Sequence, residues 1–269
     1  MKDFFQFVKK IGTRIVPLSS GEHGSGASYI REALATSPVS VSRVRDRSDD
    51  GAFYFLFESL FRGSTEEIKR RQAIYLPYVR EASIRSKGLF FLDAGCGKGE
   101  FLDLLKGQGV PAKGVDISRI NVERIQETGG EVVLSDALEY LETLEDDSLI
   151  GLSMFQVIEH LEFEQIHQLL KSAFKKISLQ GVVIVESVNP YCSMALGRFY
   201  LDPTHKRPYA PDLMKFTLEW HGFEQVGILY SSPVLRKFHS RKTAEKYQDY
   251  AVVGRKMNPD LSSEAHDFV

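Results

Sequence analysis

The stretch DAGCGKGE, residues 93–100, combines an acidic residue with three glycines and follows a short apolar run. Gly95, Gly97 and Gly99 allow the backbone to turn tightly and to approach a ligand without a Cβ in the way. An amphipathic pattern follows, and the first turn of a helix offers unpaired N–H groups and a positive dipole end. We therefore predict a turn that holds a nucleotide-like ligand at the mouth of a parallel sheet.

Two acidic residues farther along the chain could complete such a site. Asp116 lies 21 residues after Gly95, the distance at which an acidic side chain meets the ribose hydroxyls of a nucleotide. Asp136 could accept a hydrogen bond from an adenine amino group, and the Ala137 N–H could donate to the ring. The third glycine comes one residue too early for the G-x-G-x-x-G of dinucleotide-binding proteins, and the sequence has no GxxxxGK[ST] phosphate loop.

Histidines with neighbouring carboxylates are the candidates for proton transfer. His160 follows Glu159 directly after an apolar run, and His205 lies three residues after Asp202 in a loop bounded by prolines. A histidine beside a carboxylate can act as a general base near neutral pH. The structural alternatives are that His160 caps a helix and that His205 only orders its loop.

Two other kinds of chemistry are open to the same region. If the acceptor is a phosphate oxygen, no base is needed, and Arg62, Arg71 and Arg207 become the important groups. A divalent metal could bind the two His–carboxylate pairs, but an adjacent Glu–His is a poor spacing for two ligands, so we predict no metal site. Cys96 and Cys192 form no CxxC pattern, and we expect neither a disulfide framework nor a catalytic thiol.

The elements that position these residues alternate along the chain. Apolar strands are expected at 89–93, 112–118, 131–137, 149–157, 181–188, 223–230 and 249–255. Helical patterns are expected at 65–79, 99–107, 119–128, 159–177 and 211–221. This alternation predicts a Rossmann-like doubly wound sheet of about seven strands, with the last strand antiparallel, preceded by a helical extension. The carboxyl ends of its parallel strands form one rim, so the predicted site residues should gather there.

Composition excludes several classes of protein. The chain has 269 residues, 43% of them hydrophobic and 26% charged, with a net charge of −2, so it should be globular and should bind no nucleic acid. We find no apolar run of about 18 residues that could span a membrane and no secretory signal. A cytoplasmic protein is therefore expected. Trp220 is expected in the core.

The domain organisation is expected to have four parts. Residues 1–50 should form a flexible or amphipathic arm, 51–88 a helical leader packed on the catalytic domain, 89–256 that domain, and 257–269 a tail. Residues 1–20 have apolar side chains at helical spacing among Lys and Arg. Such a helix could lie on the inner face of the cytoplasmic membrane, on a partner, or on its own domain.

Four ordered motifs resemble those of class I S-adenosylmethionine-dependent methyltransferases. DAGCGKGE resembles the family's D-x-G-x-G-x-G/E, and GVDIS, SDA and FQVIEHL resemble the next three motifs at their usual spacing. The resemblance covers about residues 89–256, and it implies S-adenosylmethionine as cofactor and S-adenosylhomocysteine as product. The cofactor-binding residues that we then expect are Asp93, Ala94, Gly95, Gly97, Gly99, Asp116, Ile117, Asp136, Ala137, Phe155, Gln156, Arg71 and Gln72.

Two further segments resemble the methyltransferases encoded in bacterial surface-polysaccharide (O-antigen) clusters. They are FESLFRGSTEEIKRRQAIYLPYV, residues 57–79, and YLDPTHKRPYAP, residues 200–211. The resemblance implies methylation of a sugar hydroxyl or a terminal phosphate on a glycan or its lipid-linked precursor, with a glycan-assembly enzyme as a further partner. The implied catalytic residues are His205, His160, Asp202 and Glu159, and the implied substrate-binding residues are Arg62, Tyr75, Tyr200 and Arg207.

Two other interpretations are open. A small-molecule O- or C-methyltransferase of the quinone-biosynthesis type shares the V-I-E-H-L turn, but the D-P-T-H loop and the leader helix speak against it. An inactive, cofactor-binding scaffold subunit could dock a glycan-assembly enzyme through residues 1–50. The intact Asp116 and Asp136 argue against a scaffold without activity.

Overall fold

The computed structural model describes residues 54, 57–58, 60–86, 88–234, 242 and 244–258. The chain divides into two compact units, Met1–Ser64 and Thr65–Val269. The predicted arm at residues 1–50 and nearly all of the predicted tail lie outside the described residues. The division into arm, leader, catalytic domain and tail stays a prediction.

In the first unit, the described residues include helical backbone with aromatic side chains. The rings of Tyr54 and Phe57 stack with centroids 6.0 Å apart, and Phe57 lies 5.0 Å from Phe61. The Arg62 N–H donates to the carbonyl of Glu58 at 2.9 Å, which closes the last turn.

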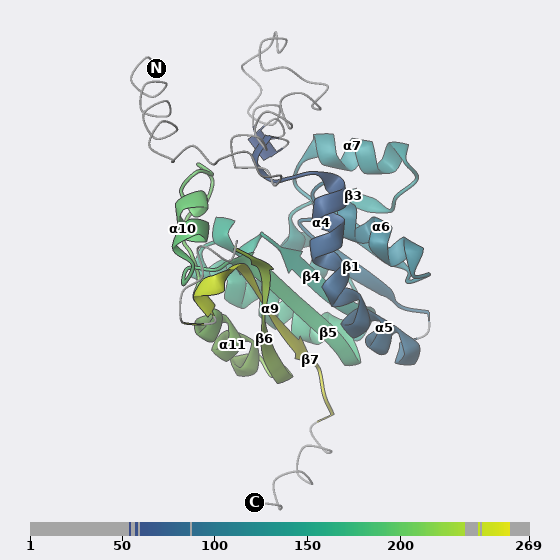
Figure 1. The fold of residues 1–269 in the computed structure, drawn as a ribbon. Coiled ribbons are helices and arrows are strands. Elements are labelled where there is room, and N and C mark those ends of the chain that lie inside the picture. The colour runs from purple at the N-terminus through teal and green to yellow at the C-terminus, as the bar shows by residue number, and fades with distance from the viewer. Residues whose placement is uncertain are drawn as a thin grey trace, which may run out of the picture. The chain divides into compact units, whose positions relative to one another are not determined.

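The second unit is built on a seven-stranded sheet with the order β3-β2-β1-β4-β5-β7-β6 (Figure 1). The strands are β1 Phe90–Ala94, β2 Ala112–Asp116, β3 Val132–Leu134, β4 Leu149–Phe155, β5 Ile177–Val188, β6 Glu224–Pro233 and β7 Tyr247–Arg255. Strands β1 to β5 pair in parallel, and β7 is antiparallel to both of its neighbours, β5 and β6. The predicted doubly wound sheet with an antiparallel last strand is confirmed.

Helices cover both faces of this sheet (Figure 1). They are α4 Thr65–Gln72, α5 Leu76–Arg85, α6 Glu100–Gly107, α7 Arg119–Glu127, α8 Ala137–Glu142, α9 Phe163–Lys176, α10 Ser193–Phe199 and α11 Pro211–Trp220. Short 3-10 turns are formed by Ala73–Tyr75, Ile158–His160 and Ala244–Lys246.

Alternating side chains of the central strands divide the core into two layers. Phe91 and Ile184 pack with α5 and α6 on one face, whereas Leu92 and Val185 pack with α9 and α11 on the other. All seven residues of β4 are buried, as expected for a strand at the centre of a parallel sheet. A Cβ on Gly151 would lie 2.4 Å from the carbonyl oxygen of Val182, so β4 and β5 can approach only because this residue is glycine.

Local signals in the sequence set several helix ends. The Ser118 side chain accepts from the Asn121 N–H at the start of α7, and Glu162 forms a reciprocal capping box with Gln165 at the start of α9. Pro77 ends the first helical run and lies in the first turn of α5, where its missing N–H costs no hydrogen bond.

Some expected elements differ in the structure. The strand expected at 131–137 has only three residues, because Asp136 begins α8, which was not predicted. The expectation for Trp220 is wrong: its side chain is 70% exposed, since α11 buries the face that carries Met214, Thr217 and Leu218.

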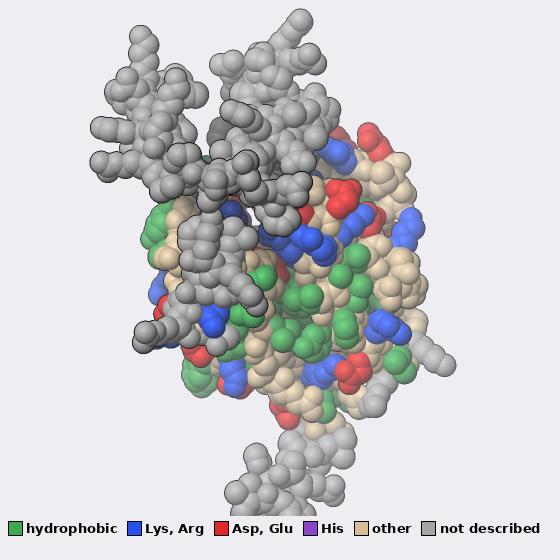
Figure 2. Space-filling view, viewed as in Figure 1, with side chains coloured by type: hydrophobic (Ala, Val, Ile, Leu, Met, Phe, Trp, Pro, Cys, Tyr) green, Lys and Arg blue, Asp and Glu red, His purple; other side chains and the backbone are tan. Residues whose placement is uncertain are grey.

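The surface of the second unit mixes charged and apolar side chains. Figure 2 shows hydrophobic side chains gathered on the face viewed, bordered by Lys, Arg, Asp and Glu. No helix among the described residues is long and apolar enough to cross a membrane.

Candidate active site

The glycine turn after β1 has the backbone that its sequence predicts. Gly95, Gly97 and Gly99 have φ angles of 70°, 54° and 82°, in the left-handed region that favours glycine. A Cβ on Gly95 would also lie 2.5 Å from Cγ2 of Val157, so the turn lies directly against the segment that follows β4. The turn thus joins the ends of the two central strands at the rim.

Asp116 connects this turn to the end of β2. Its carboxylate accepts from the Gly97 N–H at 2.8 Å and from the Ser118 N–H at 2.7 Å, and only 8% of the residue is exposed. The next residue, Ile117, is 78% exposed at the rim. Asp116 therefore fixes the shape of the glycine turn, and its contact with a ribose stays a prediction.

The other predicted acidic residues have structural partners as well. Asp93, 2% exposed beside Ala94, accepts from the Ser153 hydroxyl at 2.5 Å. Asp136 caps α8, because its Oδ1 accepts from the N–H groups of the second and third residues of the helix, at 2.8 and 3.3 Å. Ala137 is the first residue of that helix. Adenine contacts at Asp136 and Ala137 stay predictions.

A group of acidic and polar side chains lies at the end of β5, and sequence reasoning missed two of its members. The Tyr75 hydroxyl donates to Glu186 at 2.5 Å, and the Gln156 amide lies 3.3 Å from Glu186 and 3.5 Å from Asp249. Burial, and then the charge of Asp249, raise the pKa of Glu186 to about 7. A glutamate inside the otherwise apolar run GVVIVESV was the signal that could have drawn attention to it.

The predicted residues on the leader and at the end of β4 take different positions. Tyr75 is fully buried and its ring lies 5.2 Å from that of Phe155, which is 4% exposed, so both rings belong to the core. Gln156 has a φ of 56°, a strained backbone that turns its side chain toward the acidic group. Arg71 pairs with Glu67 on its own helix.

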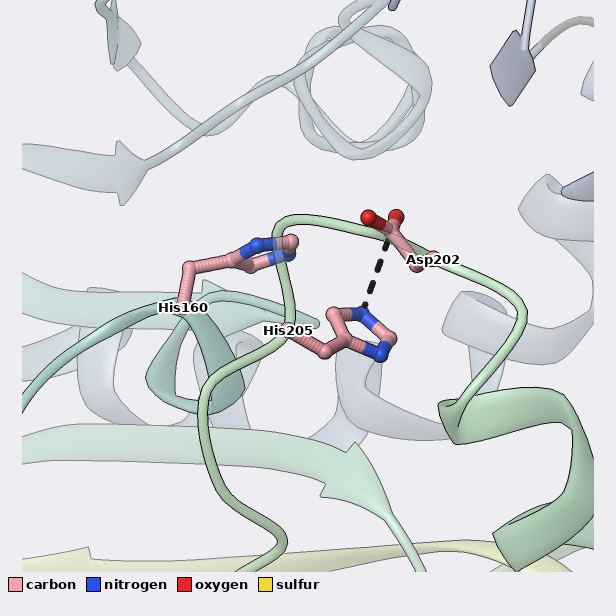
Figure 3. Close-up of side chains that lie close together, drawn as sticks. All are labelled: His160, Asp202 and His205. Atoms are coloured by element: carbon pink, nitrogen blue, oxygen red, sulfur yellow. Dashed lines mark ion pairs between the residues drawn. The ribbon is translucent and has the colours of Figure 1, made fainter.

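His160 lies beside Asp202 and His205, although it is about 40 residues before them in the sequence (Figure 3). The His205 ring lies 4.7 Å from that of His160, and its Nε2 lies 3.8 Å from Oδ2 of Asp202. Its Nδ1 donates to the carbonyl of Phe199 at 2.8 Å. Because a carbonyl can only accept, this bond fixes the proton on Nδ1, and Nε2 of the neutral ring carries the lone pair.

His160 is held in its neutral form. Burial, and then the charge of His205, lower the pKa of His160 to about 4, although the carboxylate of Asp202 acts in the opposite direction. The His160 ring is therefore neutral at neutral pH.

Glu159 is placed differently from the other predicted catalytic residues. It is fully buried, and its Oε2 accepts from the Ser187 hydroxyl at 2.9 Å, while Oε1 has no hydrogen-bond partner. Burial raises its pKa to about 8, so the side chain is protonated at neutral pH. The carbonyl of Glu159 accepts from the Lys206 N–H at 2.8 Å, which ties the loop after α10 to the turn after β4.

The structure also shows which residues could hold a metal ion. Within the described part of the chain, ligand atoms of His160, Asp202 and His205 all lie within 4.8 Å of one another. Glu159 is not a member of this group, so the four-residue set considered from the sequence is reduced to three. The prediction that the site uses no metal stays a prediction.

The predicted substrate-binding residues lie in different parts of the chain. Tyr200 is 74% exposed at the end of α10, with its ring edge against Phe199. The Arg207 guanidinium lies 5.6 Å from the centre of the Tyr209 ring. Arg62 belongs to the first unit, and Tyr75 is part of the core.

The strand order and the glycine turn define a class of protein, the nucleotide-binding doubly wound α/β enzymes. The model of a methyltransferase-domain family matches residues 68–241, and the chain belongs to that family. It is therefore a class I S-adenosylmethionine-dependent methyltransferase, as the ordered motifs predict. No curated protein sequence matches the chain.

Solved structures show the same fold. The chain is similar to a SAM-dependent methyltransferase from Archaeoglobus fulgidus, with 36% identity and a TM-score of 0.67 over 76% of this chain and 100% of that one. It is also similar to a possible histamine N-methyltransferase from Thermotoga maritima, with 20% identity and a TM-score of 0.54 over 77% and 97%. A phosphoethanolamine N-methyltransferase from Haemonchus contortus, solved with S-adenosylmethionine, has 13% identity and a TM-score of 0.52 over 75% and 59%. At these lower identities, the last two show the fold alone.

The residues of the rim fit S-adenosylmethionine. The turn at Gly95 leaves no room for a Cβ, and Asp116 offers carboxylate oxygens at the end of β2. Gln72 is 5% exposed at the end of α4, and its side-chain oxygen has no hydrogen-bond partner among the described residues, so it could accept from an amino group of the ligand. The contact made by each of these residues stays a prediction.

Proposed function

We propose that this methyltransferase acts on an oxygen of a bacterial surface glycan or of its lipid-linked precursor, either a sugar hydroxyl or a terminal phosphate. Two observations support the proposal. The leader 57–79 and the loop 200–211 resemble those of O-antigen methyltransferases, and the loop brings His205 and Asp202 against His160 at the carboxyl end of the sheet.

The observation that carries an oxygen acceptor is the arrangement of His205. The Phe199 carbonyl holds the proton on Nδ1, so Nε2 can receive a proton, and the carboxylate of Asp202 lies 3.8 Å away to stabilise the resulting imidazolium. A sugar hydroxyl must lose its proton as it attacks, and this pair supplies the base. S-adenosylmethionine, when bound, supplies a methyl group already activated by its sulfonium.

Positioning of the acceptor against the methyl group contributes the larger part of the rate acceleration. The acceptor oxygen must lie in line with the methyl group, and holding two reactants in that geometry can lower the barrier by roughly 7 to 11 kcal/mol. Exposed Tyr200 beside the loop offers an aromatic face for a sugar, and Arg207 a charge for a phosphate.

Transfer of labelled methyl from S-adenosylmethionine to a lipid-linked glycan extract tests this function. We expect label in the glycan fraction with the wild-type protein, and a loss of about 100-fold or more in His205→Ala at unchanged affinity for S-adenosylhomocysteine. His221→Asn is the matched control, because this histidine bonds to His167 between α9 and the end of α11. Label found only in small molecules would contradict the glycan acceptor, and unchanged turnover in His205→Ala would remove the base.

A further inference from the structure

Thr204 lies between two members of the histidine–carboxylate cluster, His160 and Asp202. Its N–H and its hydroxyl both contact Oδ1 of Asp202, at 2.8 and 2.7 Å. The same hydroxyl oxygen lies 2.9 Å from Nδ1 of His160, which comes from the turn after β4. One side chain thus contacts two of the three members of the cluster.

The direction of these hydrogen bonds follows from the chemistry of the groups. An ionised carboxylate only accepts, so the single proton of the Thr204 hydroxyl goes to Asp202. The hydroxyl oxygen can then only accept from His160, whose Nδ1 must carry a proton. The chain of bonds therefore runs from His160 Nδ1–H to the Thr204 hydroxyl and on to Oδ1 of Asp202.

We propose that Thr204 is a positioning residue for methyl transfer, because its two bonds to Oδ1 of Asp202 turn the other carboxylate oxygen, Oδ2, toward Nε2 of His205. This inference rests on the proposed function, in which His205 is the base. Thr204 acts through Asp202, and its bond to His160 keeps that neutral ring in place 4.7 Å from the ring of His205.

The other charged groups near the cluster are directed elsewhere. Lys206 pairs with Glu162 at 3.3 Å, and the guanidinium of Arg207 lies over Tyr209. Glu159 is buried beneath the loop and protonated at neutral pH, and His160 is neutral. Asp202 is therefore the carboxylate whose orientation decides how well an imidazolium at His205 is stabilised.

Replacing the hydroxyl by a methyl group tests the proposal. Thr204→Val keeps the shape of the side chain and the N–H bond to Asp202 but removes the bonds of the hydroxyl to Asp202 and His160. Thr204→Ser keeps the hydroxyl. The maximal rate of methyl transfer to the glycan extract is measured from pH 5 to 9 for both, together with the dissociation constant of S-adenosylhomocysteine. Thr143→Val is the matched control, because the Thr143 hydroxyl bonds only to a backbone carbonyl, that of Tyr140, at an exposed helix end.

We expect Thr204→Val to lower the maximal rate about ten-fold and to move the acid limb of its pH profile to lower pH, since an imidazolium with a misaligned carboxylate gives up its proton more readily. Thr204→Ser should stay within about two-fold of the wild type, and the cofactor should bind all variants equally.

Three results would overturn the proposal. In the first, the maximal rate of Thr204→Val depends on pH as that of the wild type does, while His205→Ala is inactive. His205 would then still be the base, but Thr204 would have no positioning role. Another is a failure of Thr204→Ser to restore the profile. The third is activity that EDTA abolishes and Mn²⁺ or Zn²⁺ restores, because the cluster would then bind a metal. If His205→Ala itself keeps full activity, the proposed function fails first.

Discussion

At the scale of single residues, Asp116 orders the glycine turn, and the sequence predicts that the same side chain binds the cofactor. Its two oxygens accept from backbone N–H groups on opposite sides, one in the glycine turn and one after β2. A carboxylate has about four lone-pair sites, so each oxygen can accept a further bond from a ribose hydroxyl. Binding the ligand would therefore use a group that the fold has already oriented.

Replacement of Asp116 by Ala should weaken the binding of S-adenosylhomocysteine by ten-fold or more, as measured by isothermal titration calorimetry. The variant loses a charged acceptor for the ribose and also the bond that shapes the turn at Gly97, and a bond to a charged group contributes about 1.5 to 3 kcal/mol. Asp146→Ala is the matched control, because this exposed residue pairs with Lys176. Equal affinities for the two variants would contradict the role of Asp116, and no binding by the wild type would contradict the cofactor assignment.

The sequence predicts site residues well where they belong to one short unit of the chain, because their spacing is then visible in the sequence itself. The spacing of Gly95, Gly97, Gly99 and Asp116 is fixed by one strand–turn–helix–strand unit, and the structure places all four together. Thr204 and His160 are 44 positions apart, and their contact depends on how a loop folds back on the sheet. No periodicity or spacing could reveal it.

At the scale of elements, the order of the last strands shows the same limit. The sequence predicts an antiparallel pair at the edge, but the later strand, β7, lies between β5 and β6. Its five residues from Tyr250 to Gly254 are buried, whereas Ser231 is the one buried residue of β6. Both segments are apolar enough to be strands, and only their pairing with β5 decides which one lies inside.

Asn189 fastens this arrangement at the end of β5. It is fully buried, its Nδ2 donates to the carbonyls of Ala244 and Tyr247 at 2.8 Å each, and its Oδ1 accepts from the Tyr191 N–H at 3.0 Å. The two bonds from Nδ2 hold the segment that leads into β7 against the end of β5, and the third shapes the turn that follows β5.

We expect Asn189→Ala to lower the free energy of unfolding by about 2 to 4 kcal/mol, because it leaves three backbone groups, which are partly buried, without this partner. Urea unfolding followed by circular dichroism measures the loss. Asn121→Ala is a suitable control, since Asn121 is also buried but its Oδ1 has no hydrogen-bond partner, and its loss should stay below about 1 kcal/mol. Similar losses in both variants would show that the Asn189 bonds are not what holds the segment.

At the scale of the whole molecule, the fold buries acidic groups at the carboxyl end of its sheet. Glu159 lies in the turn after β4, and Glu186 lies near the end of the adjacent strand, β5. Burial is the largest cause of the raised pKa of each. Each carboxyl is protonated in the folded protein at pH values where it is ionised in the unfolded chain. Between its unfolded pKa and its folded pKa, the folded state therefore binds more protons than the unfolded state. The stability of the whole unit should therefore depend on pH.

The sign of this dependence follows from the pKa values. For Glu159 the pKa is 4.5 in the unfolded chain and about 8 in the folded one, so its contribution is complete below pH 4.5 and is lost as the pH rises toward 8. The free energy of unfolding of the wild type should fall on the order of 4 kcal/mol over this range through Glu159 alone. Glu159→Gln imitates the protonated side chain and should make the stability depend less on pH, leaving the part that Glu186 contributes up to about pH 7.

Urea unfolding at several pH values measures how steeply the free energy of unfolding changes with pH. Exposed Glu164→Gln on α9 is the control that should keep the wild-type slope. A Glu159→Gln protein whose stability falls as steeply as that of the wild type would show that this buried carboxyl does not hold its proton.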